Sequence, residues 1–191
     1  MDANFPGTVI KRQGKSAEEF LSGLFFATKG IMLLQVREIT GLDSPVIQNW
    51  INRGWVKSPD QKRYSSDHLS RIMMINMLRD VLKLDDIANI FTYIIGDTNS
   101  EENNTGAETL LYIYICDILD IIDYETIFSE TALEQIIEKR VNTDFDSFGW
   151  DKKRLTDGIK IILTYYAAVL IKTRADRRAA GIIYNITDSK I

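Results

Sequence analysis

Apolar residues recur at three- and four-residue intervals along most of the chain, which predicts a protein built mainly from helices. The first helix is expected over about residues 17–27, and the sequence SAEE at its start has capping-box spacing. Two shorter helices are expected over 35–40 and 45–53. Gly41 separates them and Gly54 follows the second, both at positions where helices commonly end in a left-handed residue.

The helix expected over 45–53 has one apolar and one polar face. Ser44 is a suitable cap and Pro45 fits the first helical position. The spacing turns Ile47, Trp50 and Ile51 inward. Three amide side chains are left on the outer face, namely Gln48, Asn49 and Asn52.

The segment after this helix predicts a small β-hairpin wing over residues 55–64. Its first arm is extended, Pro59-Asp60 marks a turn, and the sequence KRY returns. A helix over about 67–81 follows, and Asp85-Asp86 opens another one.

The polar sequence GDTNSEENNTG predicts a linker over 97–106, which would divide the chain into residues 1–96 and a helical bundle over 107–191. Three helices are expected in the bundle, over about 107–123, 130–142 and 151–180. The last is apolar nearly all round at 161–171 and carries a stripe of 3-4 spacing, formed by Leu155, Ile159, Ile162, Tyr166 and Val169. This stripe fits pairing with a second copy, and it equally fits a core helix.

Charge is unevenly distributed along a chain whose net charge is −4. Residues 28–95 carry nine positive and seven negative side chains, whereas residues 96–150 carry two positive and thirteen negative ones. Residues 151–191 are basic again, with nine positive and four negative side chains. Since DNA repels acidic surfaces, we expect the acidic segment to face away from it or to neutralise the basic C-terminal helix.

The chemistry of catalysis and metal binding has few candidates in this sequence. It holds no Ser-His-Asp set, phosphate-cradling glycine loop or Cys-His pair, and His68 is its one histidine. Residues 97–108 have calcium-loop spacing, but Glu102 stands where the loop needs glycine. We therefore expect no enzyme activity, no cofactor and no metal site, and a solvated acidic face at Asp117, Asp120 and Asp123.

The single cysteine and the apolar runs bear on location. Cys116 excludes an internal disulfide, suits a reducing compartment, and is expected to be a buried thiol. The longest uncharged apolar run is too short for a bilayer, and residues 1–14 lack a signal-like apolar run. We expect a cytoplasmic protein with no membrane contact.

The order helix, glycine turn, capped helix, glycine, wing and two helices is that of a winged helix-turn-helix. Residues 34–95 resemble the DNA-binding module of MerR-type regulators, through EITGLDSPVIQNWINRGWV and KRYSSDHLSRIMMINMLRDVLKLDDIANIF. The resemblance implies an all-α fold with a small β wing, and binding of double-stranded DNA. The sequence departs from MerR at Gln48 and Asn49, where those regulators commonly have an Arg and a Tyr that contact the sugar-phosphate backbone of DNA.

The whole chain also resembles a Gram-positive bacterial family known only as domain of unknown function eighteen-thirty-six. The strings QVREITGL, IQNWINRGWV, KRYS and RIMMINMLRDVLKLDDI carry that likeness. It implies a MerR-like N-terminal half joined to a helical C-terminal half, and no established activity.

Together these features predict a homodimeric DNA-binding transcriptional regulator, with helix 45–53 in the major groove and the wing on the phosphate backbone. A protein-interaction module that uses the same scaffold without DNA is the alternative. The predicted contact residues are Arg37, Ser44, Gln48, Asn49, Asn52, Arg53, Lys57, Lys62, Arg63 and Tyr64. A small-molecule effector is left open, and the tyrosines of the bundle fit core packing better than a ligand pocket.

Overall fold

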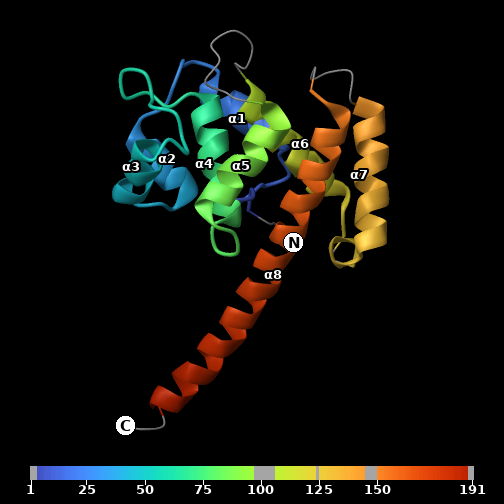
Figure 1. Ribbon diagram of the computed structural model, residues 1–191. Helices are drawn as coiled ribbons and strands as arrows, with labels where there is room; N and C mark the ends of the chain where they lie inside the picture. The colour runs from blue at the N-terminus through green and yellow to red at the C-terminus, as the bar shows by residue number, and fades with distance from the viewer. Residues whose placement is uncertain (1–3, 97–105, 124, 145–149, 189–191) are drawn as a thin grey trace.

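The computed structural model describes residues 4–96, 106–123, 125–144 and 150–188, and these residues are mostly helical (Figure 1). The described part contains no β-sheet, which confirms the all-α prediction. The helices in chain order are α1 (Ala17–Phe25), α2 (Leu33–Thr40), α3 (Ser44–Asn52), α4 (Ser66–Leu78), α5 (Leu84–Ile95), α6 (Ala107–Ile121), the 3-10 helix η1 (Thr126–Phe128), α7 (Glu130–Asp144) and α8 (Lys152–Asp188).

The α2–turn–α3 unit forms where the sequence predicts it. Gly41 and Gly54 both have positive φ, 71° and 76°, as expected for residues that end helices. The cap residue differs from the prediction. Helix α3 begins at Ser44, and the extended residue at the N-cap position is Asp43. The Asp43 carbonyl accepts from the backbone N–H of Val46 at 3.0 Å, so Ser44 already lies within the first turn.

The predicted β-hairpin wing is not confirmed, because residues 55–64 contain only one antiparallel bridge, between Asp60 and Arg63. A tight turn closes where the Arg63 N–H donates to the Asp60 carbonyl at 2.7 Å, with φ of 47° at Gln61 and 63° at Lys62. The returning arm then pairs away from the first arm, since Tyr64 and Ile31 exchange backbone hydrogen bonds of 2.8 and 2.9 Å. The wing is therefore a loop anchored to the segment before α2.

A single hydrophobic core joins the two halves of the described chain. Helix α4 lies at its centre, with buried residues on every face, and packs against α2, α5, α6 and α8. Core residues come from both sides of the predicted linker, for example Ile72 and Leu111, both 0% exposed. Most of the linker over 97–106 lies outside the described residues, and the division into two domains stays a prediction.

Asp67 connects the N-terminus of α4 to that of α6. Its carboxylate accepts from the backbone N–H of Gly106 at 2.6 Å and from that of Thr109 at 3.0 Å. The Thr109 hydroxyl also donates to it, at 2.7 Å. A carboxylate at a helix N-terminus satisfies N–H groups that have no partner within the helix, so this contact fixes where α6 begins.

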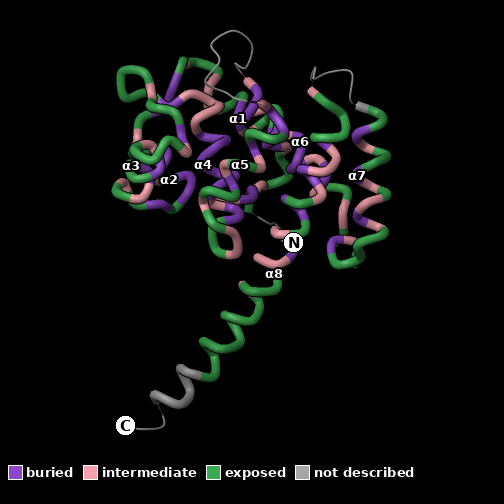
Figure 2. The backbone as a smooth tube through the Cα atoms, in the orientation of Figure 1, coloured by how far each residue is buried: buried purple, intermediate pink, exposed green. Residues whose placement is uncertain are grey.

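The long helix α8 is buried at its start and exposed at its end (Figure 2). Leu155, Ile159 and Ile162 are each 0% exposed, so this part of the predicted pairing stripe packs inside the chain itself. In residues 161–171, which are apolar nearly all round, Ile161 is 41% and Ile171 55% exposed in the single chain. Among the described helices, none combines the length and hydropathy needed to cross a membrane.

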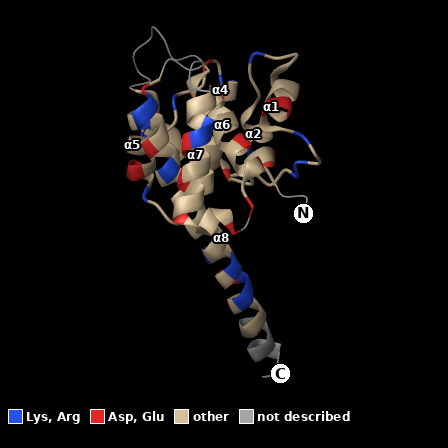
Figure 3. Ribbon diagram, turned by 90° about the vertical axis from the view of Figure 1, so that its right-hand side faces the viewer, with Lys and Arg blue, Asp and Glu red and all other residues tan. Residues whose placement is uncertain are grey.

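The acidic α7 and the helix α3 lie at opposite ends of the body in Figure 1, and Figure 3 looks onto the α7 end. Lys160 of α8 is within 3.3 Å of Glu134 and 2.9 Å of Glu138 on α7. Arg140 of α7 approaches Asp117 of α6 at 3.7 Å. Acidic side chains thus face away from α3 and partly neutralise α8. Asp117 belongs to these ion pairs, so the face predicted as only solvated is in part salt-bridged.

Candidate nucleic-acid interface

Helix α3 separates an inner apolar face from an outer polar face. Ile47 and Trp50 are 0% and 2% exposed, and both belong to the core. Gln48, Asn49 and Asn52 are exposed, in agreement with the periodicity of the sequence. The core therefore fixes the orientation of α3, and the three amides project from the body.

The turn that ends α3 is fixed by the backbone. The Trp50 carbonyl accepts from the N–H of Trp55 at 3.0 Å and from that of Val56 at 3.3 Å. On the inner side, the Arg79 guanidinium of the segment after α4 lies 6.0 Å from the centre of the Trp50 ring. Backbone and ring contacts together hold the exit of α3 against the core.

Tyr64 is a buried residue that contacts the outer face of α3 through its hydroxyl. Its side chain is only 2% exposed, so it is not available as the DNA contact that the sequence predicted. Instead, the Gln48 amide donates to the Tyr64 hydroxyl over a long 3.4 Å hydrogen bond. Burial raises the pKa of Tyr64 above its ordinary value of 10.0, so the hydroxyl is neutral at physiological pH. Tyr64 thus orients Gln48.

Arg53 lies at the C-terminal end of α3. Its Nε donates to the Asn49 side-chain oxygen at 3.3 Å, and its guanidinium is 5.3 Å from the centre of the Trp55 ring. Exposed cation–π contacts of this kind contribute about 0.5–1 kcal/mol. The contacts keep a positive charge beside Asn49, on the surface that α3 presents.

Arg37 lies at the other end of α3. It approaches Asp43, just before α3, at 3.8 Å, and the Asp43 side chain is 84% exposed. Such an exposed pair contributes little to stability. Ser44, the neighbouring predicted contact, is partly buried in the first turn of the helix.

The wing brings further cations to the same part of the chain. Arg63 donates to the Gly30 carbonyl at 3.1 Å, and a Cβ on Gly30 would lie 2.9 Å from the Arg63 Cβ. Glycine at position 30 thus allows the wing to lie close to the segment before α2. Lys57 and Lys62 are both exposed.

Arg71 holds the base of the wing, although the sequence gives no indication of this role beyond an arginine on the apolar helix α4. Its Nε donates to the Trp55 carbonyl at 3.0 Å, and its guanidinium lies 4.6 Å from the centre of the Phe91 ring. Burial lowers the pKa of Arg71 to about 10, against the charge of Glu108, which raises it. The Trp55 indole also donates to Asp85 at 2.8 Å.

Other reactive groups lie in the core. Cys116 is 0% exposed, and burial raises its pKa to about 12, so it is the inert buried thiol that was predicted. The Tyr112 hydroxyl donates to the Pro6 carbonyl at 2.9 Å, and Tyr114 is 3% exposed. Within the described ranges, no group of three or more His, Cys, Asp or Glu side chains has the arrangement of a metal site. The calcium-like pattern over 97–108 falls mostly outside them.

Comparison with known families identifies one match. Residues 31–115 match the family model of a domain of unknown function (DUF1836). The match runs from the segment before α2 into α6, so it includes the α2–α3 unit, the wing and the central helix α4. No curated protein and no solved structure matches the chain.

Proposed function

We propose that the protein is a sequence-specific DNA-binding regulator that acts as a homodimer and reads DNA with α3. The observation that carries the proposal is a nine-residue helix with a buried inner face and three exposed amides outside. Cations accompany it at three places. Arg37 lies at its start, Arg53 at its end, and the Lys62–Arg63 turn precedes the tyrosine that contacts its middle.

Each exposed group has a chemical role in this proposal. Gln48, Asn49 and Asn52 would face base edges, because an amide can donate to and accept from adenine in the major groove at once. Lys57 and Lys62 would neutralise phosphates, which gives affinity and register without sequence information. Since Gln48 is held by the Tyr64 hydroxyl, less side-chain freedom is lost on binding.

The salt dependence of binding tests the role of the wing. Lys62→Ala is expected to weaken binding to all duplexes alike and to lower the slope of log K against log salt by about 1. Lys139→Ala, on exposed α7 at the far end, is the matched control and is expected to leave the slope unchanged. Fluorescence anisotropy with duplexes of mixed sequence measures both. Equal slopes for the two variants would contradict the role of the wing.

One observation favours a protein partner instead. Asp43 puts an exposed carboxylate beside the start of α3, where it offsets Arg37 and repels phosphate. If α3 binds DNA, Asp43→Asn should raise DNA affinity at low salt. If α3 binds a protein, the wild type and Asp43→Asn should both stay at the background level of DNA binding.

A further inference from the structure

The C-terminal part of α8 leaves the body of the protein and continues alone (Figures 1 and 2). Every described side chain from residue 174 to 182 is exposed. Two large apolar side chains of α8 are among the exposed residues, since Ile171 is 55% and Ile182 63% exposed. Helices in water draw most of their stability from packing of an apolar face, so this segment lacks the support that α8 has near its start.

Small and apolar side chains on the outward side of α8 form a continuous stripe, which we call the outer stripe. It consists of Ile161, Thr164, Ala168, Ile171, Ala175 and Ile182. The intervals are 3, 4, 3, 4 and 7 residues, so all six lie on one face with coiled-coil spacing. Arg178 takes the remaining position of the pattern. The outer stripe is distinct from the buried face of Leu155, Ile159 and Ile162.

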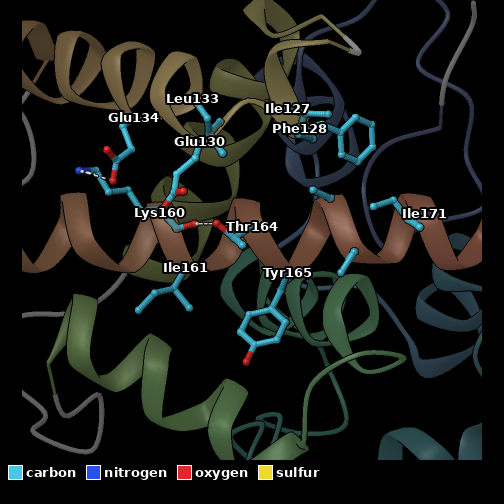
Figure 4. Close-up of a pocket in the computed structure, with 12 residues that line it drawn as sticks. Ile127, Phe128, Glu130, Leu133, Glu134, Lys160, Ile161, Thr164, Tyr165 and Ile171 are labelled. Atoms are coloured by element: carbon cyan, nitrogen blue, oxygen red, sulfur yellow. Dashed lines mark hydrogen bonds and ion pairs between the residues drawn. The ribbon is translucent and has the colours of Figure 1, made fainter.

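The first part of the outer stripe lines a groove of about 630 Å³ between α8, α7 and η1 (Figure 4). Phe128 of η1 and Leu133 of α7 contribute apolar side chains to it, together with Ile161 and Ile171 of α8. Glu130 and Glu134 also line it, and Lys160 of α8 lines it as well, 3.3 Å from Glu134. The groove is thus apolar within, with Glu130 and the Glu134–Lys160 ion pair along the α7 side.

The second part of the outer stripe complements this groove in shape and charge. It projects beyond the body, it is apolar along the same face, and residues 171–182 carry four positive side chains against one negative. An antiparallel pair of α8 helices would set Ile171 against the second copy's Ala175, and Thr164 against the second copy's Ile182. Large side chains then meet small ones, as close helix packing requires.

An antiparallel arrangement also satisfies the charges. The second copy's Arg178 would come to Ala168, in the groove that Glu130 and Glu134 line. By two-fold symmetry each copy fills the groove of the other, so the contact closes on itself. A parallel pair would instead bring Arg178 next to Arg178 of the second copy, and it would leave both grooves uncovered.

We propose that the occupant of the groove is the projecting end of α8 from a second copy of this chain, in an antiparallel two-fold dimer. This deepens the homodimer part of the proposed function. It is measured without DNA, so a failure here leaves the α3 proposal untouched, and a failure of DNA binding leaves this one untouched.

Crosslinking of the full-length protein tests the arrangement. The double variant Thr164→Cys/Ile182→Cys is expected to form a disulfide-linked dimer under mild oxidation. The two positions are 18 residues apart on one helix, about 27 Å, so they cannot bond within a copy. Each single variant and the wild type, whose Cys116 is buried, are expected to stay uncrosslinked. Crosslinking of either single variant to itself would indicate parallel pairing and overturn the proposal.

The mass in solution supplies an independent test. At micromolar concentration light scattering should give twice the 21.9 kDa of the chain, and Ile171→Asp should give the monomer mass. Ala180→Asp is the control, because it lies nine residues on and therefore on the opposite face of α8. Circular dichroism checks that both variants are folded. A monomeric wild type, or an Ile171→Asp dimer, would overturn the proposal and leave the groove to another occupant.

The charges give a third readout. Glu130→Lys is expected to weaken the dimer at least several-fold, and adding Arg178→Glu should restore much of that loss. Rescue by the second reversal requires that the two side chains lie near each other across the interface. If the double reversal is as weak as the single one, the antiparallel register is wrong.

Discussion

Gln48 is the residue at which the outer face of α3 meets the core. Its side chain is exposed, yet its amide nitrogen contacts the hydroxyl of the buried Tyr64. Tyr64 belongs to the wing, so this hydrogen bond connects the wing to the middle of α3.

His68 is the residue whose protonation state matters most for the start of α4. Its Nδ1 accepts from the Ser65 N–H at 3.1 Å, while the Ser65 hydroxyl accepts from the His68 N–H, which completes a capping box. Burial lowers the pKa of His68 below its ordinary 6.5, more than the Ser58 backbone and the Asp67 charge raise it. A protonated Nδ1 can no longer accept, so the cap favours the neutral ring.

The pH dependence of unfolding checks this account. Because the folded-state pKa is lowered, the unfolded chain takes up the proton first as pH falls through 6.5. The wild type should therefore lose stability between pH 7 and pH 5 relative to His68→Gln, since glutamine keeps the capping box without titrating. Urea unfolding across that range measures the difference. Parallel stability curves for the two proteins would rule out a role for His68 titration.

At the scale of the elements, local patterns predicted most of the helices. Caps, glycines and 3.6-residue periodicity place α1 to α7 within a few residues of their observed bounds, because these features act within one or two turns. The outer amides of α3 followed from the same periodicity. Helix α8 continues through Gly181 to Asp188, beyond the end predicted near residue 180, so this glycine does not end the helix.

Long-range contacts were not predictable from these local patterns. The predicted wing is not confirmed, because Tyr64 pairs with Ile31, 33 positions earlier, and nothing in residues 55–64 indicates that partner. The same pairing places Tyr64 in the core and removes it from the predicted contact set. Arg71 was missed for a similar reason, since its contacts with Trp55 and Phe91 join separate elements.

The contact between α5 and α8 depends on Gly158. A Cβ at this position would lie 2.2 Å from Ile94 Cγ1 and 2.4 Å from its Cδ1, and Ile94 is 2% exposed. Overpacking in a core costs about 1–3 kcal/mol, and this clash lies at the upper end, against about 1 kcal/mol gained in helix propensity. Gly158→Ala should therefore lower the free energy of unfolding.

Gly23→Ala is the matched control for this substitution. Gly23 lies in α1, where an added Cβ would meet no neighbouring atom within 4 Å, so alanine should raise the free energy of unfolding by about 0.5–1 kcal/mol. Urea unfolding of both variants measures whether each change lowers or raises the free energy of unfolding. A stabilised Gly158→Ala protein would show that α8 moves freely against α5, contrary to the close packing described above.

At the scale of the whole molecule, the surfaces proposed for DNA binding and for dimerisation are far apart. Helix α3 lies at one end of the body, the acidic α7 at the other, and α8 projects from the body with its basic end outward (Figures 1 and 3). The proposed dimer uses α7 and α8, and so leaves α3 of both copies exposed. Two reading helices related by a two-fold axis would recognise two inverted half-sites.

Selection from a random duplex library with the full-length protein tests whether α3 reads sequence. We expect enrichment of one motif, repeated with inverted symmetry, and a changed base preference for Gln48→Ala at one position of each half-site. Lys62→Ala should enrich the wild-type motif with weaker binding. No enrichment by the wild type, with binding no higher than background at low salt, would contradict the claim that α3 reads DNA.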